Sequence, residues 1–388
     1  MIKIKILVLL AFTQIYFFGC QENKKIDQIY ITTNQDISSQ KTKINLQLNQ
    51  NKDIIQGTIK TRGGYSINFP KKSYEIDLEN DISLLGLPDD DDWILNANFI
   101  DKTFLRHVVS YELFQDMRIE NKISKTKYVE ILINNQYEGL YVLMQKLDKS
   151  TLEIDEKERE SVIFKDPHIF RESYSNIIPQ KENNFHQQVF PKLFKSNKNH
   201  FIEEIRDFIL NSSDSMFNEY IGDVFDIKNI ADWHLLLLIT NNSDGVLKNF
   251  YLYKIDNKTP LRISPWDYDH SFGRDGDNEL NINVRKVDLK RSILFSRLLA
   301  CRWYKNLLKQ RWIVLNEQNI LSIKGLKNRI SNKYSEIDEF IIKNNHKWPT
   351  SNNIYYDNNS SNDEIKIMFD FIDNRHLELN QYFNNILE

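Results

Sequence analysis

The sequence predicts an α+β fold with two lobes, a β-rich lobe over residues 29–165 and a helix-rich lobe over residues 166–388. Short runs of alternating apolar and polar residues fill the first part, and long amphipathic patterns fill the second. A strand pair at residues 244–275 interrupts the helical part. With 388 residues, 41% of them hydrophobic and 12% aromatic, the chain can bury a large core.

The N-terminus has the layout of a secretory signal. Residues 1–19 place two lysines before an apolar run that is too short to cross a bilayer comfortably. Residues Phe17–Cys20 resemble the lipobox of bacterial lipoproteins, whose cysteine becomes the lipidated first residue of the mature chain. We therefore expect a lipoprotein signal at 1–19, a polar tether at 20–28, and a lipid anchor on Cys20 that holds the protein in the bacterial cell envelope, periplasmic or surface-exposed. A buried structural thiol is the alternative for Cys20.

Composition argues against several classes of protein. The formal net charge is −3, so the chain lacks the basic footprint of nucleic-acid binding, and we expect no nucleic-acid partner. Besides Cys20 the chain has Cys301 alone, which predicts no disulfide framework. The sequence has no His-rich or Cys-rich ligand set, which argues against zinc.

The β-rich part predicts an antiparallel meander from Ile29 to about Leu78, followed by one helix and a hairpin. We expect Asp101 or Thr103 to cap the helix, which runs to about Met117. The hairpin follows, with its turn at Asn134-Asn135. Before the helix, the four acids of DDDD at 89–92 predict a solvated turn, since adjacent carboxylates repel one another.

The remainder predicts an irregular segment and then helices. Residues 166–200 are polar, as in an insertion or lid. Helical patterns cover about 201–211 and 227–240, a strand hairpin covers 248–269, and a mostly helical stretch follows from Ser292.

Three oxygen-bearing side chains in the strand pair point to phosphoryl transfer. Asp244 lies in a turn after a helix, Asn249 follows five residues later, and Asp267 ends the next strand. Protein kinases place a catalytic Asp, a metal-binding Asn and a second metal-binding Asp in this order. Mg²⁺ favours such carboxylate and phosphate oxygens. An ordinary Asp-Gly turn and a strand-edge cap are the alternatives for the first two residues.

The surroundings of Asp267 strengthen this interpretation. Trp266 and Tyr268 flank it, so its carboxylate costs desolvation energy unless something positive pairs with it. Asp269 lies on the same face if the run is extended, and we expect it either to share metal ligation or to pair with Arg274.

A lysine and a glutamate could complete such a site. Strand alternation predicts that Lys72 points inward and Lys71 lies at the surface. An inward lysine needs an anionic partner, and Glu112 lies in the middle of an apolar arc of the predicted helix. Lys72 with Glu112 is the pairing of a kinase fold. Alternatively Glu112 reaches solvent, or Arg106 is the partner of the acid or of phosphate.

A glycine turn in KTRGGYS offers a phosphate site. Gly63-Gly64 predict a tight turn whose backbone N–H groups can cradle phosphate, with Arg62 and Ser66 beside it. A plain hairpin turn is the alternative.

Several ordered segments between about residues 55 and 275 resemble the CotH family of atypical kinases, named for a bacterial spore-coat protein. They are TRGGYSINFPKKSY, DDDWILNANFIDKTFLRHVVSYEL, VEILINNQYEGLYVLMQKLD and the pair DGVLKNFYLYK and PWDYDHSFG. The chain departs from the family at Gly64, where Asn is common, and at Gln145, where Glu is common.

The resemblance implies a two-lobed atypical protein-kinase-like fold that transfers the γ-phosphate of ATP, with Mg²⁺ or Mn²⁺, to a hydroxyl of a protein substrate of unknown identity. At the matching positions Asp244 is the catalytic base, Asn249 and Asp267 are metal ligands, and Lys72 contacts the phosphates. The alternatives are a non-catalytic surface adhesion or binding lipoprotein of the same fold, and metal-dependent hydrolysis by the same carboxylates. An intact metal-binding set favours an enzyme.

Overall fold

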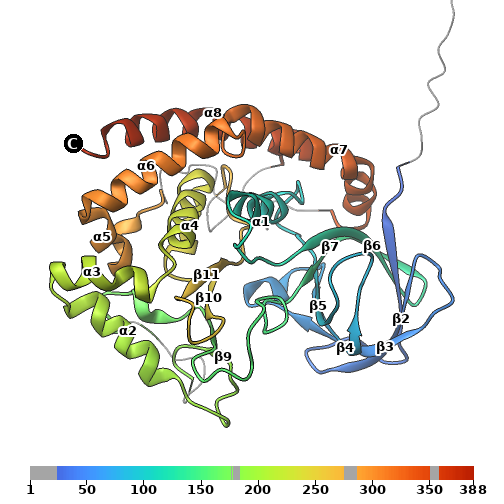
Figure 1. Ribbon diagram of the computed structural model, residues 1–388. Helices are drawn as coiled ribbons and strands as arrows, with labels where there is room; N and C mark the ends of the chain where they lie inside the picture. Colours follow the sequence, from blue (N-terminus) through green and yellow to red (C-terminus); the bar gives the residue numbers. More distant parts are fainter. Residues whose placement is uncertain (1–23, 176, 178–183, 275–285, 350–357) are drawn as a thin grey trace, which may run out of the picture.

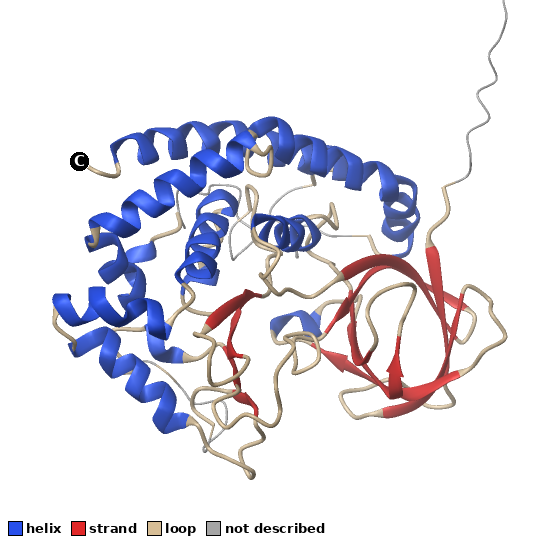
Figure 2. Cartoon of the chain, in the orientation of Figure 1, coloured by secondary structure: helices blue, strands red, loops and turns tan. Residues whose placement is uncertain are grey.

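The computed structural model describes residues 24–175, 177, 184–274, 286–349 and 358–388 (Figure 1). The expected signal, Cys20 and the tether up to residue 23 lie outside the described residues. The N-terminal part is rich in strands and the C-terminal part in helices, as predicted (Figure 2). None of the helices that the model describes is long and apolar enough to cross a membrane.

Seven strands form a closed barrel in the N-terminal part, in the order β1-β2-β3-β4-β5-β7-β6. The predicted meander is present as β1 to β4, and the parallel pairing of β1 with β6 closes the barrel. The strands are β1 Asp27–Thr32, β2 Thr42–Leu48, β3 Ile55–Arg62, β4 Ser73–Ile82, β5 Asp90–Asn96, β6 Thr126–Ile133 and β7 Gln136–Gln145. One side chain in two points into the barrel, where Ile29, Ile59, Ile76, Trp93, Val129 and Leu143 are buried together.

The hairpin between β6 and β7 has the predicted turn. Asn134 and Asn135 both adopt left-handed backbone angles, with φ of 49° and 64°. Two consecutive left-handed residues match the twist of the flanking strands, and Asn tolerates this conformation better than most residues.

A second sheet and seven α-helices make up the C-terminal part as far as its residues are described. The sheet has the order β11-β10-β8-β9, and its strands are β8 Val162–Lys165, β9 Gln188–Phe190, β10 Phe250–Lys254 and β11 Arg262–Pro265. The predicted hairpin is β10 with β11, and β9 comes from the segment expected to be irregular. The helices are α2 Asn199–Asn211, α3 Asp214–Val224, α4 Ile227–Thr240, α5 Ile293–Ala300, α6 Arg302–Glu317, α7 Ile323–Lys347 and α8 Ser361–Asn385. The predicted helices at 201–211 and 227–240 are α2 and α4, whereas α3 was not predicted.

Helix α4 is the buried axis of this part. Residues 229–240 are all buried, and the helix packs against α1 (Arg106–Met117), β11, α6 and α8. Asp226 caps it by accepting a hydrogen bond from the backbone N–H of Asn229. Figure 1 shows α1 between α4 and the barrel, with α7 reaching across to β7. Helix α1 therefore lies where the two parts of the molecule meet.

Helix α1 begins later than predicted. The residue before it, Leu105, has no side-chain cap, and Asp101 lies in the turn before the helix. The Asp101 carboxylate accepts hydrogen bonds from the N–H of Arg106 at 2.9 Å and from the hydroxyl of Thr103 at 2.6 Å. The predicted end at Met117 is confirmed.

Candidate functional site

The β10–β11 hairpin and the segments that flank it return to the C-terminal end of α4. The helix ends at Asn241, which has φ of 55°, and the 3₁₀ turn η3, Asp244–Val246, follows. After β11 the chain comes back, and the N–H of Phe272 donates to the carbonyl of Thr240 at 3.0 Å. The turn with Asp244 and the segment with Asp267 therefore lie at the same end of one buried helix.

Asn249 and Asp267 are in direct contact. The side-chain amide of Asn249 donates to the backbone carbonyl of Asp267 at 3.4 Å, and the N–H of Trp266 donates to the carbonyl of Asn249 at 2.9 Å. Both residues have left-handed backbones, with φ of 62° and 60°. Asn and Asp adopt this conformation more readily than other residues with a side chain, though still at a cost, and such residues collect at functional sites.

Asp244 is half-buried and pairs with Lys248, whose Nζ lies 3.0 Å from Oδ2. Within the residues that the structure describes, no hydrogen bond or ion pair joins Asp244 to Asn249 or Asp267. What Asp244 shares with them is the C-terminal end of α4, where both segments return.

The Asp267 side chain is half exposed, at 50%, and faces a buried histidine. Nε2 of His107 lies 3.3 Å from Oδ1 of Asp267. Desolvation raises the pKa of Asp267, but the hydrogen bond from His107 and the charges of His107, His270 and Arg62 outweigh it and hold the pKa below its usual value. The carboxylate is therefore ionised at neutral pH and open to solvent on one side.

Asp269 has the opposite shift. Desolvation, followed by the negative charge of Asp267, raises its pKa against the opposing charge of His270. Nε2 of His270 is 3.9 Å from Oδ1 of Asp269. The predicted alternative partner, Arg274, binds Glu364 of α8 through two guanidinium nitrogens. Asp267 and Asp269 thus form an acidic pair whose full ionisation a nearby cation would favour.

Sequence reasoning missed Asp166 and His107. The Asp166 carboxylate accepts a hydrogen bond from the N–H of Phe250 at 3.1 Å, and desolvation together with the negative charge of Asp267 raises its pKa. Its signal is an acid that directly follows strand β8 and precedes Pro167. His107 carries a weaker signal, since it is a polar residue on an otherwise apolar helix face.

The glycine turn lies close to this group of acids. Arg62 ends β3, and its guanidinium carbon is 5.9 Å from the ring centroid of Trp266, the neighbour of Asp267. Gly63 has φ of 126°, and a Cβ at this position would lie 2.2 Å from the hydroxyl oxygen of Ser66. The turn therefore requires glycine at 63, and Ser66 lies in the 3₁₀ turn η1, Tyr65–Asn68, that follows.

The prediction that Lys72 points inward and Lys71 outward was wrong. Lys71 is 1% exposed, and its Nζ donates to the carbonyl of Ala97 at 2.9 Å and to that of Leu140. Desolvation holds its pKa well below the usual range, and the charge of Glu138 opposes this shift only in part. Strand β4 begins at Ser73, so its alternation does not extend back to the two lysines. The ammonium of Lys72 instead donates to the carbonyls of Ile67 and Phe69, at 2.8 and 2.6 Å. It therefore stabilises the segment that directly follows the glycine turn.

The predicted pair of Lys72 with Glu112 does not form. Glu112 faces α7, where its carboxylate lies 3.0 Å from Arg329 and 3.0 Å from Lys333. Arg106 does not pair with it either, because its guanidinium contacts Asp101 at 2.6 Å and Glu364 at 3.0 Å. Glu112 therefore ties α1 to α7, on the side away from Asp267.

The acidic turn at 89–92 was also mispredicted, because it enters strand β5. Asp90 is fully buried, and its Oδ2 accepts a hydrogen bond from Gln145 at 3.1 Å. Desolvation raises the pKa of Asp90 to about 6. A glutamate at 145, as in the family pattern, would place a second acid against this carboxylate, so Gln145 fits its surroundings.

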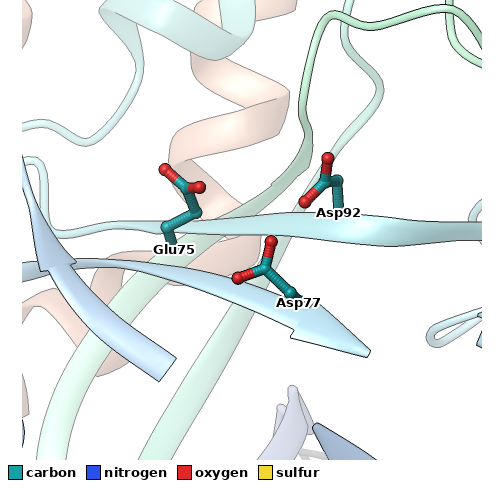
Figure 3. A group of neighbouring side chains, drawn as sticks. All are labelled: Glu75, Asp77 and Asp92. Carbon is teal, nitrogen blue, oxygen red and sulfur yellow. The ribbon is translucent and has the colours of Figure 1, made fainter. Parts of the chain in front are cut away.

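Among the described residues, two groups of three acids at the barrel have carboxylate oxygens within 4.8 Å of one another. Asp267 and Asp269 belong to neither group. Figure 3 shows one of these groups, Glu75 and Asp77 on β4 with Asp92 on β5. The other is Asp90, Asp91 and Asp148. Three lysines balance the first group, with contacts from Lys41 to Asp77 at 2.9 Å, from Lys60 to Glu75 at 3.0 Å, and from Lys146 to Asp92 at 3.2 Å and Glu75 at 3.3 Å. This group is a neutral ion-pair network on the barrel wall.

The donor set at Asp267 fits a divalent cation of the Mg²⁺ type. Mg²⁺ binds through one or two protein carboxylates and completes its shell with water and phosphate oxygens, so three preassembled carboxylates are not required. The half-exposed Asp267 carboxylate and the adjacent Asn249 amide supply such oxygens on strained backbones.

Comparison with known proteins identifies the family. The family model described as CotH kinase protein matches residues 59–379, most of the chain. The chain belongs to the CotH family. Its relatives include the inner spore coat protein H of Bacillus subtilis (strain 168), which is 20% identical over 291 residues, 74% of this chain and 78% of the relative. The CotH match extends about a hundred residues beyond the segments that carry the resemblance in sequence, into α8.

Proposed function

We propose that this CotH protein is a kinase that uses a divalent metal ion to transfer the γ-phosphate of ATP to hydroxyl groups of a protein. In this proposal the barrel and the helical part are the two lobes of an atypical protein-kinase-like fold. The contact between Asn249 and Asp267, at the end of the helix that also leads to Asp244, is the observation that carries the proposal. These residue types occur in the order that phosphoryl transfer by kinases uses.

Each side chain has a proposed task. Asn249 and Asp267 hold Mg²⁺ or Mn²⁺, with Asp269 as a further carboxylate, and the ion neutralises charge on the phosphates when it is bound. Asp244 accepts the proton of the acceptor hydroxyl, and the ammonium of Lys248 lies 3.0 Å from its carboxylate. Arg62, Ser66 and the backbone of Gly63 and Gly64 contact the phosphates, and Lys72 supports this turn through two carbonyls.

A labelling experiment tests the proposal. The chain without residues 1–20 is incubated with γ-labelled ATP and Mg²⁺ or Mn²⁺, in parallel with Asp244→Ala and Asp267→Ala. We expect each variant to lose labelling by a factor on the order of 100 or more, since each removes a group that acts in the transition state. The matched control is Asp223→Ala, which removes an exposed acid on α3.

The outcomes separate the candidate functions. Equal labelling by the parent and both site variants would contradict the kinase proposal. Release of inorganic phosphate that depends on Asp267, without transfer to protein, would favour hydrolysis. Glycan or cell binding that survives both substitutions, in a chain that binds no nucleotide, would favour the adhesion alternative.

Anchoring in the cell envelope is the second part of the proposal. We expect Cys20 to carry the lipid, which places the soluble fold outside the cytoplasm behind a short tether. Incorporation of labelled fatty acid into the wild-type chain, and its absence in Cys20→Ala, is the expected result. Equal incorporation in both would rule out Cys20 as the anchor.

A further inference from the structure

Helix α1 holds the Asp267 segment at three points. Nε2 of His107 lies 3.3 Å from the Asp267 carboxylate, and the backbone N–H of Asp267 donates to the hydroxyl of Tyr111 at 3.2 Å. One position before His107, Nε of Arg106 donates to the carbonyl of Ser271 at 2.9 Å. His107 and Tyr111 are one helical turn apart and face the same side. Helix α1 thus holds both the side chain and the backbone of Asp267.

The conformation of Asp267 needs such support. Its φ of 60° costs conformational energy even for Asp, which tolerates it better than most residues, and contacts from neighbouring groups offset that cost. The contact from Asn249 to the carbonyl of Asp267, at 3.4 Å, is long for a hydrogen bond. His107 and Tyr111 are 3% and 1% exposed, so their own positions are fixed by packing. They reach Asp267 at 3.3 and 3.2 Å, so Asp267 is held by several long contacts, two of which come from a packed helix.

The opposite face of α1 is attached elsewhere. Arg329 of α7 binds Glu112 at 3.0 Å and Asp116 at 2.5 Å, and Lys333 adds a third contact. The helix therefore has a fixed frame that does not depend on the Asp267 segment. Because α7 holds α1 in place, contacts from α1 can set the position of Asp267. Contacts within the segment that contains Asp267 move with it and cannot do so.

We propose that His107 and Tyr111 are positioning residues for Asp267. His107 directs the carboxylate outward through a hydrogen bond that its Nε2 donates, and Tyr111 holds the left-handed backbone by accepting the Asp267 N–H. The proposal rests on the proposed function in one respect, that the carboxylate so placed receives a divalent ion. Neither side chain is a metal ligand in this scheme, because Nε2 of His107 and the hydroxyl of Tyr111 both face Asp267, and Nδ1 of His107 is buried.

Two measurements on the purified full chain test the proposal. The first is hydrogen exchange of residues 264–273, and the second is the affinity for Mn²⁺ alone, by calorimetry. The variants are His107→Leu, which removes the hydrogen bond, His107→Gln, whose amide reaches the position of Nε2, and Tyr111→Phe. Tyr128→Phe is the matched control, since it removes another buried phenol hydroxyl, which donates to the Phe104 carbonyl at 3.0 Å, away from Asp267.

We expect Tyr111→Phe and His107→Leu to raise exchange at the Asp267 amide and to weaken Mn²⁺ binding. The loss of affinity should be on the order of tenfold for His107→Leu, whose hydrogen bond goes to a charged carboxylate, and roughly threefold for Tyr111→Phe, which loses a bond to a neutral N–H. His107→Gln should restore most of the affinity, which a merely structural role of the imidazole would not predict. Tyr128→Phe should lower the melting temperature without either local effect.

The outcomes distinguish this inference from the proposed function. If exchange of residues 264–273 and Mn²⁺ affinity are the same in the parent, His107→Leu and Tyr111→Phe, the positioning inference is wrong, even if the chain is a kinase. If the parent binds no Mn²⁺ and yet both variants raise exchange, the two residues do hold Asp267 and the metal-dependent function fails. If His107→Leu does not fold, Tyr111→Phe and His107→Gln still decide.

Discussion

Replacing Arg106 by leucine should destabilise the fold strongly. Its guanidinium is 1% exposed and contacts Asp101 at 2.6 Å, Glu364 at 3.0 Å and the carbonyl of Ser271 at 2.9 Å. Removing one member of a buried ion pair leaves an uncompensated charge and typically costs about 3–5 kcal/mol. Glu364 keeps its contacts with Arg274, and Asp101 keeps the N–H of Arg106 and the hydroxyl of Thr103, so we expect the lower part of this range, about 3 kcal/mol.

Calorimetric melting measures this loss. Unfolding entropy of about 2 cal/mol/K per residue makes 3 kcal/mol equivalent to a fall of about 4 °C in a chain of this size. Arg106→Lys keeps the charge but not the forked geometry, and should fall between the parent and leucine. The control Arg159→Leu changes an exposed arginine and should shift stability by less than about 0.5 kcal/mol. A melting temperature of Arg106→Leu within about 1 °C of the parent would refute the view that this buried network joins α1 to α8.

Three further predictions concern pH and backbone geometry. The pKa of Asp90 is raised to about 6, so the folded state binds this proton more tightly than the unfolded state, and stability falls as pH rises from about 4 to 6. In Asp90→Asn this fall in the free energy of unfolding, up to about 3 kcal/mol, should be absent when it is measured by urea titration between pH 4 and 6. The same dependence of the free energy of unfolding on pH in variant and parent would contradict the prediction. Asp226 is the opposite case, because Arg118 and Arg262 outweigh desolvation and lower its pKa to about 2. The stability that the ionised Asp226 contributes is present above pH 4 and is lost as the pH falls towards 2. In Asp226→Asn the free energy of unfolding should therefore change less with pH in this range. The same pH dependence as in the parent would contradict a role of these ion pairs in stability. Gly63→Ala should lower stability by about 1–3 kcal/mol because φ is 126° and its Cβ would meet Ser66, whereas Gly64→Ala meets nothing within 4 Å. Equal melting temperatures for the two glycine variants would argue against strain at 63.

Local patterns predicted much of the fold and part of the site. The turn at Asn134-Asn135 and the spacing of Asp244, Asn249 and Asp267 depend on residues close in sequence, and the structure has the turn and the contact between the last two. Alternation along a strand also holds, but only from the residue where the strand begins. That is why the prediction for Lys71 and Lys72, just before β4, was reversed.

Contacts between distant segments were not predictable in the same way. The parallel pairing of β1 with β6 closes the barrel across about a hundred residues, and Glu112 finds its partners on α7 more than two hundred residues later. His107 and Asp267 are also far apart in sequence, so no periodicity relates them. A single sequence fixes the face on which such a side chain lies, but its partner depends on how the elements pack.

Charge balance separates the acids that stabilise this fold from those that can serve a metal. The barrel group of Glu75, Asp77 and Asp92 has three lysines within 3.3 Å, so its formal charges balance. Desolvation and the neighbouring Asp77 raise the pKa of Asp92 to about 7, so the group carries no net negative charge at neutral pH. At the Asp267 site, the negative charge of Asp267 raises the pKa of Asp269. The side chains that face these two carboxylates within 4 Å are those of His107 and His270. Against desolvation, the Asp267 carboxylate raises the pKa of His107, and an imidazolium there offsets the charge of one carboxylate, so the pair keeps negative charge when both acids are ionised. A divalent ion is therefore expected at Asp267 rather than at the barrel acids, although the barrel acids lie closer together.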